Sequence, residues 1–258
     1  MSRNTAVRNL LIFGLVLLSA GIVSAQQTFN TTIYFDYTNY LSNNGPVTSA
    51  AKDNFFAFRR AYFTYENKVN DNLKFRFRYD ADNTANLTSI DLTKGSTKKD
   101  DKFRPFIKHL YLDYAGLLPN SSLKVGMTPT LTFESAEARW GYRSVAKTLV
   151  DGYKDITGVE IDASSADIGA SLTGSLAKYV RYGVMFYNGA GYSHAEGDKY
   201  KKIAANVQLI PVAGLSIIGY MDYEKQDKDN SATTYKVDGF LEMLKNLVLG
   251  AEYVVYKN

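Results

Sequence analysis

Apolar and polar residues alternate in short runs along most of the chain. In the run LKFRFRYD, residues 73–80, every second residue is apolar, and the residues between them are Lys74, Arg76, Arg78 and Asp80. Successive side chains of a β-strand point to opposite faces, so this run predicts a strand with one aromatic and one ionic face. Eleven such runs are predicted as strands: 28–40, 55–68, 72–80, 104–114, 121–128, 161–174, 179–188, 200–210, 215–223, 234–243 and 247–256.

The connections between the predicted strands alternate between short and long. The short ones lie near residues 70–72, 117–122, 176–178, 211–214 and 245–246, and the longer ones are 41–54, 81–103, 129–160, 189–198 and 224–232. A soluble meander has no reason to sort its loops in this way, whereas a transmembrane barrel has short turns at one end and long loops at the other. The pattern predicts an all-β, antiparallel up-and-down transmembrane β-barrel.

The polar face of each strand has two readings. In a soluble antiparallel sheet it meets water, and in a membrane barrel it lines the lumen while the apolar face meets lipid. Strands near 10 residues suit a tilted membrane crossing of about 9–11 residues. Aromatic residues near strand ends match interfacial girdles: Phe77, Tyr79, Tyr114, Tyr182, Phe186, Tyr220, Tyr223, Tyr253 and Tyr256. We therefore predict that the polar face is the interior.

The first 25 residues have the order of a secretory signal peptide. A basic segment with Arg3 and Arg8 precedes 14 apolar residues, and small residues ending at Ala25 follow. The alternatives are a membrane anchor or a buried helix, but a spanning helix needs about 20 apolar residues. We predict a cleaved signal peptide over 1–25 and one barrel domain over 26–258, exported to the outer membrane of a Gram-negative bacterium.

Composition adds few constraints on the remaining 233 residues. They contain 28 Lys and Arg against 26 Asp and Glu. This near balance lacks the excess of positive charge that is typical of nucleic-acid-binding domains. The chain has no Cys, so disulfides do not stabilise it. Its 20 Tyr exceed what a core needs, and Tyr suits positions where one end of the ring is apolar and the other is wet.

Three segments carry a family resemblance. FFAFRRAYFTYENKVNDNLKFRFRYDADN has a paired arginine, a tight Asn/Asp turn and a second alternating strand. FIKHLYLDYAGLLPNSSLKVGMTPTLTFESAE has a strand–turn–strand with a Gly-x-x-Pro segment and a Glu. AKYVRYGVMFYNGAGY is a basic and aromatic strand ending in Asn-Gly. Their order resembles the phosphate-selective porin O and P family, over residues 55–256. The resemblance implies a pore of about 16 strands, often trimeric, that passes anions or other small solutes.

The predicted strand number is odd, whereas a barrel of this class closes with an even number. The last run also lacks the terminal aromatic residue that the resemblance implies. We expect a chain that lacks about five strands at its C-terminus; the alternative is a count that is wrong by one.

The cations on the polar face are the candidate pore-lining residues. Selective members of the family use arginine ladders and lysine clusters, and this chain offers Arg60, Lys74, Arg76, Arg78, Lys124, Arg181 and Lys202. Acids share the same face: Glu66, Asp80, Asp113, Asp222, Asp238, Glu242 and Glu252. We expect a wall that prefers anions, with phosphate-like anions as an implication of the resemblance alone.

The link 129–160 predicts the constriction. Its segment 135–150 has helical character and holds the single Trp, Trp140, and we expect it to fold inward so that Arg139, Arg143 and Lys147 narrow the pore. The alternative is a short helix over the rim of the barrel with its charges in solvent.

The sequence offers little for catalysis. His109 falls on the polar face of a strand, where a hydrogen-bonded wall residue is expected, and His194 falls in a surface loop. No nucleophile, nucleotide or metal-binding motif is found, so no enzyme, cofactor or metal is predicted. Three hypotheses stay open: an outer-membrane channel, a surface binding or structural module acting through loops 81–103 and 189–199, and a barrel-embedded hydrolase. The expected partners are outer-membrane lipid and small anions or polar solutes.

Overall fold

One large antiparallel sheet dominates the molecule. The computed structural model describes residues 26–39, 54–82, 88–91, 93, 96–99, 103–143, 147–152, 164–244 and 247–257. Eleven strands pair in the order β1-β2-β3-β6-β7-β8-β9-β10-β11-β12-β13, so each strand of the sheet lies beside its neighbours in the chain. Their bounds are Gln26–Asn39, Asn54–Lys68, Leu73–Asp82, Arg104–Ala115, Ser121–Pro129, Ala166–Ala177, Val180–Tyr187, Lys202–Leu209, Leu215–Lys225, Ser231–Leu244 and Leu247–Lys257.

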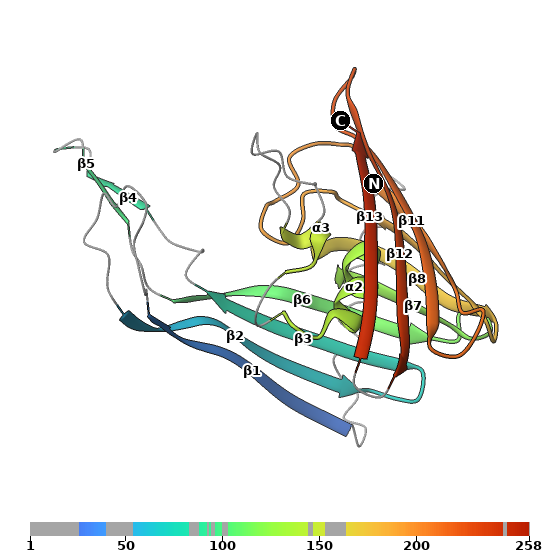
Figure 1. The fold of residues 1–258 in the computed structure, drawn as a ribbon. Coiled ribbons are helices and arrows are strands. Elements are labelled where there is room, and N and C mark those ends of the chain that lie inside the picture. Colours follow the sequence, from blue (N-terminus) through green and yellow to red (C-terminus); the bar gives the residue numbers. More distant parts are fainter. Residues whose placement is uncertain are drawn as a thin grey trace.

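All eleven predicted strands are confirmed over the described residues, and their meander order is the predicted one. Residue 40 of the first predicted strand and residues 161–163 of the sixth lie outside the described residues. Consecutive connections of a meander lie at opposite ends of the sheet. The short connections therefore share one end and the long ones the other. The structure adds a second, two-stranded sheet of β4 (Thr88–Asp91) and β5 (Ser96–Lys99) within the link 81–103, for which only a long, charged connection was predicted. Figure 1 shows this hairpin well away from the main sheet.

The main sheet is strongly curved and open (Figure 1). Strands β1 and β13 are its two edges, and the described strands do not close into a barrel. The predicted up-and-down antiparallel architecture is thus present as a curved sheet. The predicted closure is not seen.

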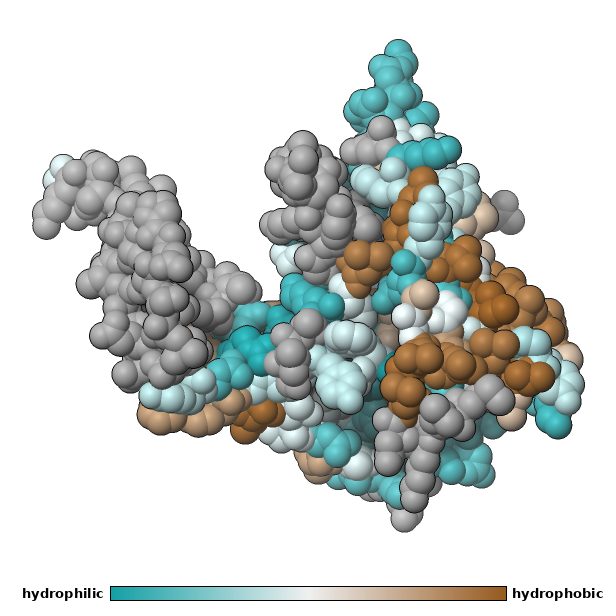
Figure 2. Space-filling view, viewed as in Figure 1, coloured by the Kyte–Doolittle hydropathy of each residue, from teal (hydrophilic) through white to brown (hydrophobic). Residues whose placement is uncertain are grey.

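The two faces of the sheet have the polarity that the alternation predicts. On β12, Tyr235 and Val237 are 47% and 53% exposed, while the intervening Lys236 and the following Asp238 are 1% and 0% exposed. We call the face of Tyr235 and Val237 the outer face and the face of Lys236 and Asp238 the inner face. Figure 2 shows hydrophobic residues gathered on the right of the molecule, where Figure 1 draws β7, β8 and β11.

Two β-bulges bring extra charges to the inner face. Between β1 and β2 the register skips Arg59, whose Nε then donates to Asp36 at 2.7 Å. Between β3 and β6 the register skips Lys108. Lys108 and His109 are both buried, whereas the residues on either side of them, Ile107 and Leu110, are exposed. A bulge adds one residue to a strand and locally breaks its alternation.

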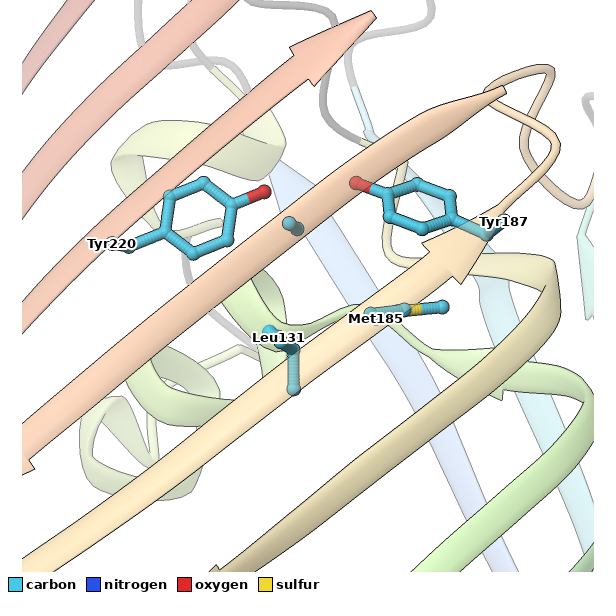
Figure 3. Close-up of a cluster of buried hydrophobic side chains, with 5 residues drawn as sticks. Leu131, Met185, Tyr187 and Tyr220 are labelled. Carbon is cyan, nitrogen blue, oxygen red and sulfur yellow. The ribbon is translucent and has the colours of Figure 1, made fainter. Parts of the chain in front are cut away.

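Helix α2 (Leu131–Trp140) lies against the inner face and is the main element there (Figure 1). Its first residue, Leu131, packs with a buried cluster from β9, β10 and β11 (Figure 3): Met185, Tyr187, Ala204 and Tyr220. Ala136 packs with Ile218 and Phe240 one turn later. No helix in the described residues is long and apolar enough to cross a bilayer.

The helical segment differs from its predicted bounds of 135–150. Helix α2 ends at Trp140 because Gly141 takes a left-handed conformation, φ 67°, which is a common helix stop. A second short helix, α3 (Leu149–Gly152), follows.

Two predicted girdle residues are also misplaced. Tyr256 lies on the inner face, opposite the buried Thr234 in the register of β12 and β13. Tyr220 is buried on the inner face, where its hydroxyl donates to Asp222 at 2.6 Å. The even-numbered position of Tyr220 on β11 gives it that face.

Candidate functional site: the charged inner face

The inner face of β2 and β3 holds a compact ion cluster. Arg60 reaches Asp82 at 2.8 Å and Asp80 at 3.2 Å, and its guanidinium group lies 5.6 Å from the centroid of the Tyr62 ring. Asp80 is fully buried. Because each buried charge has an opposite charge beside it, the cluster tolerates a position away from bulk water.

The three cations of the run LKFRFRYD share the inner face, as predicted, but their surroundings differ. Arg78 donates from Nε to the Thr64 hydroxyl at 2.7 Å, and Arg76 pairs with Glu66 at 3.3 Å. Lys74 is exposed and lies opposite Asp113 in the register of β3 and β6. Residues two apart on a strand are about 6.6 Å apart, so the three form a column of positive charge near the short-turn end of the sheet.

The remaining candidates lie farther along the sheet. Lys124 on β7 reaches Glu134 of α2 at 3.0 Å. Lys202 on β10 is buried and pairs with Glu224 at 3.0 Å, so it belongs to the wall and not to an open surface. Arg181 on β9 is exposed and lines a cavity beside α2.

The three constriction candidates have distinct roles around α2. Arg139 donates to Ser216 on β11 at 3.4 Å and lies 3.9 Å from Glu242 on β12, which ties the end of the helix to the wall. Arg143 bridges Glu137 and Asp151, each at 2.6 Å. Lys147 is exposed and donates to the Asp151 carbonyl at 3.4 Å.

Arg143 links α2 to α3 through these two carboxylates. Burial of the guanidinium group opposes its charge, but Asp151 and Glu137, together with the Tyr62 hydroxyl, raise the pKa of Arg143 above its usual value. The group is therefore a permanent cation between two acids, and it joins the segment that follows α2 to the helix itself.

Within the described residues, four cavities border α2 on the inner face, and three of them are lined mainly by polar and charged residues. The first, about 530 Å³, is lined by the charges Lys124, Arg139, Arg181, Glu134 and Glu242. The second, about 440 Å³, is lined by Lys68, Lys74, Arg76, Lys124, Glu66, Asp113 and Glu134. The third, about 560 Å³, is lined by Arg76, Arg78, Lys108, Arg143, Glu134 and Glu137. The fourth, about 840 Å³, lies between the end of α2 and strands β12 and β13, and the charged residues of its described lining are Arg139 and Glu252. Lys and Arg outnumber Asp and Glu in the lining of each of the first three cavities, whereas the fourth has one of each.

Two buried cations were missed as candidates. Lys108 lies with its Nζ 3.4 Å from the centroid of the Tyr192 ring. Lys236 contacts Asp238 at 2.9 Å, Glu252 at 3.5 Å and the Thr132 carbonyl of α2 at 3.1 Å. Lys236 stands in the polar phase of its run, so alternation alone could have found it. For Lys108 the sequence signal is the spacing of the apolar residues: Ile107 and Leu110 are three positions apart instead of two, which indicates a bulge between them.

The two histidines differ in environment. His109 is buried, and neither ring nitrogen has a hydrogen-bond partner in the structure, so the expected hydrogen-bonded wall residue is not seen. Its ring lies 6.1 Å from that of Tyr111. His194 is exposed, with Ser193 Oγ at 3.0 Å from Nδ1. Among the described residues, no group of three or more His, Asp or Glu is placed to hold a metal ion.

Comparison of the chain with models of known protein families and with curated proteins found no match. The resemblance to the porin family therefore depends on the three quoted segments alone.

Proposed function

We propose that the chain forms a water-filled diffusion channel for small polar solutes in the bacterial outer membrane, with a preference for anions. In this proposal the outer face of the sheet contacts lipid and the inner face lines an aqueous path. No residue performs catalysis, and the charges of the wall bias which ions enter.

The polarity of the sheet is the observation that carries the proposal. Large apolar side chains such as Phe56, Phe186 and Val237 are exposed along the outer face, while Lys236, Asp80 and Asp238 are buried on the inner one. A soluble monomer rarely exposes a continuous apolar surface of this extent. Burying charge inside while exposing aromatic rings outside is favourable when hydrocarbon is the outer solvent.

Three of the four cavities around α2 support the preference for anions. The cavity of about 560 Å³ has four Lys and Arg and two Glu in its lining. An excess of one sign on the walls of a narrow path raises the local concentration of ions of the opposite sign. Phosphate-like anions enter the proposal only through the resemblance.

The two edges of the sheet are the reason to propose that it closes into a barrel. Unpaired strand edges are not stable in hydrocarbon, so β1 and β13 need partners. We propose that the sheet forms 11 strands of a closed barrel of about 16, and that three such barrels associate, as the resemblance implies.

Single-channel recording in a planar lipid bilayer tests this function. The purified mature protein, with its barrel closed, is expected to produce stepwise, ohmic currents in KCl, and a salt gradient is expected to give a reversal potential of the sign for anion preference. A chain that is freely soluble without detergent and gives no current steps would contradict the proposal.

The β4–β5 hairpin favours a second candidate, a surface binding or structural module. The hairpin stands away from the main sheet in Figure 1, within one of the long connections. A protein that inserts into vesicles but gives no current would support this candidate over the channel.

A further inference from the structure

Glu134 occupies a distinctive position on α2. It lies in the first turn of the helix, and its side chain is 48% exposed. Thr132 and Ala136, two positions to either side, are buried against the wall of the sheet. Residues two apart on a helix point to nearly opposite sides, so Glu134 points from α2 into the open space.

The three charged cavities all include Glu134 in their lining, and no other described residue lines all three; the fourth cavity, beside β13, does not include it. The cavities of about 530 and 440 Å³ also share Lys124, whose Nζ lies 3.0 Å from Glu134 Oε1. The Lys124 side chain is only 13% exposed. At the junction of the cavities the carboxylate is therefore the more accessible charge of the pair.

We propose that Glu134 is a selectivity-determining residue that limits the anion preference of the channel. It places one negative charge where the cavities meet, and it offsets the charge of Lys124. This inference depends on the proposed channel function. Cations are attracted to the junction by the carboxylate, and anions meet a weaker positive field than the other wall residues alone would produce.

The size of the effect follows from the electrostatics. A unit charge about 7 Å from a monovalent ion changes the energy of that ion by about RT even at the dielectric constant of water. Removal of the charge alters the local concentration of each ion about threefold, in opposite directions for anions and cations. The permeability ratio is therefore expected to change by roughly fivefold to tenfold.

Glu134→Gln tests the proposal, because the amide keeps the shape of the side chain and its contact with Lys124 while removing the charge. We expect the anion-to-cation permeability ratio, measured as a reversal potential, to rise by roughly fivefold to tenfold. Glu196→Gln is the matched control: Glu196 pairs with Lys201 at 2.9 Å in a connection that lines none of the three cavities. An unchanged ratio in Glu134→Gln, or an equal rise in both variants, would overturn the proposal.

The absence of Cys from the chain allows a second test. In Glu134→Cys, an anionic methanethiosulfonate reagent is expected to lower the anion-to-cation ratio and a cationic reagent to raise it. Val237→Cys on the outer face is the control and should show neither change. If wild type conducts but modification at residue 134 leaves the ratio unaltered, Glu134 does not set selectivity. If wild type gives no current, the channel function itself fails.

Discussion

Lys236 illustrates how a charge is held inside this molecule. Its ammonium group contacts the carboxylates of Asp238 and Glu252 and the carbonyl of Thr132, at 2.9, 3.5 and 3.1 Å. The side chain is fully buried, as is that of Asp238. Such a group stabilises a fold only while its partners remain, because an unpaired buried charge is costly. Lys236 is also a direct polar link between β12 and α2.

Replacing Lys236 by Met is expected to destabilise the folded protein by about 3–5 kcal/mol, because Asp238 is left as an uncompensated buried charge. The double variant Lys236→Met with Asp238→Asn should recover part of that loss. Urea unfolding from lipid vesicles, followed by the fluorescence of the single Trp, measures both. Lys228→Met in an exposed turn is the control and should change the free energy of unfolding by less than about 0.5 kcal/mol. Equal effects at both lysines would contradict the structural role of Lys236.

The alternation of apolar and polar residues predicted on which face most of the inner-face cations lie, but it did not predict the residues with which they pair. The period-two pattern predicted the face of Arg76, Arg78 and Lys124 because strand geometry fixes it. It did not predict that Lys202 is sealed against Glu224, since that depends on how the chain packs around the strand. Lys108 was missed because a bulge shifts the phase by one residue.

At the scale of elements, α2 is fixed to the sheet along its length. Leu131 and Ala136 pack on the wall, Glu134 pairs with Lys124, and Arg139 donates to Ser216. The helical character of this segment was predicted, and it does lie on the inner face. Its early stop at Gly141 was not predicted, because a left-handed glycine is indistinguishable by composition from one inside a helix.

The charges of this segment yield a prediction about the path beside it. Arg143 compensates Glu137 and Asp151, and Arg139 lies near Glu242. The double variant Arg139→Gln and Arg143→Gln therefore leaves these acids uncompensated, and we expect the anion-to-cation permeability ratio to fall severalfold. Reversal potentials measure the change, and Trp fluorescence reports whether α2 stays folded against the wall.

Lys201→Gln is the control for that experiment, since Lys201 pairs with Glu196 away from the three cavities. If the double variant keeps the wild-type ratio, Arg139 and Arg143 are far from the ion path, and α2 is a rim helix with solvated charges. The opposite signs expected for this variant and for Glu134→Gln make the two experiments independent checks on the same path.

At the scale of the whole molecule, the proposed function depends on which face of the sheet contacts lipid and which face contacts water. The strand order and the two faces followed from the alternation and the loop lengths, because a meander needs only local pairing. Closure of the sheet into a barrel could not be predicted from the alternation, because it depends on the number of strands and on which strands pair with β1 and β13. The hairpin β4–β5 was missed because its strands are only four residues long.

Two adjacent residues of β10 test the orientation directly. Val207 is 48% exposed on the outer face, and Gln208 lies on the inner face, where it lines a cavity and donates to Ser216 at 3.0 Å. If lipid surrounds the outer face, Val207→Arg should destabilise the inserted protein by about 1–2 kcal/mol, because the charge enters hydrocarbon. The cost stays below that of a midplane position because Val207 lies opposite Tyr182, near the end of β10. Gln208→Arg should lower the free energy of unfolding by less than about 1 kcal/mol, because the guanidinium group of the new arginine can reach the water of the cavity.

Urea unfolding from lipid vesicles and the fraction of protein inserted measure this difference. Val207→Ala separates the loss of the valine side chain from the introduction of charge and should be milder than Val207→Arg. A sheet whose outer face met water would accept arginine at residue 207 without loss, since the substitution would only add a charge to a solvated surface. Equal tolerance at residues 207 and 208, or a greater loss at 208, would therefore reverse the assignment of the two faces and remove the basis for a channel.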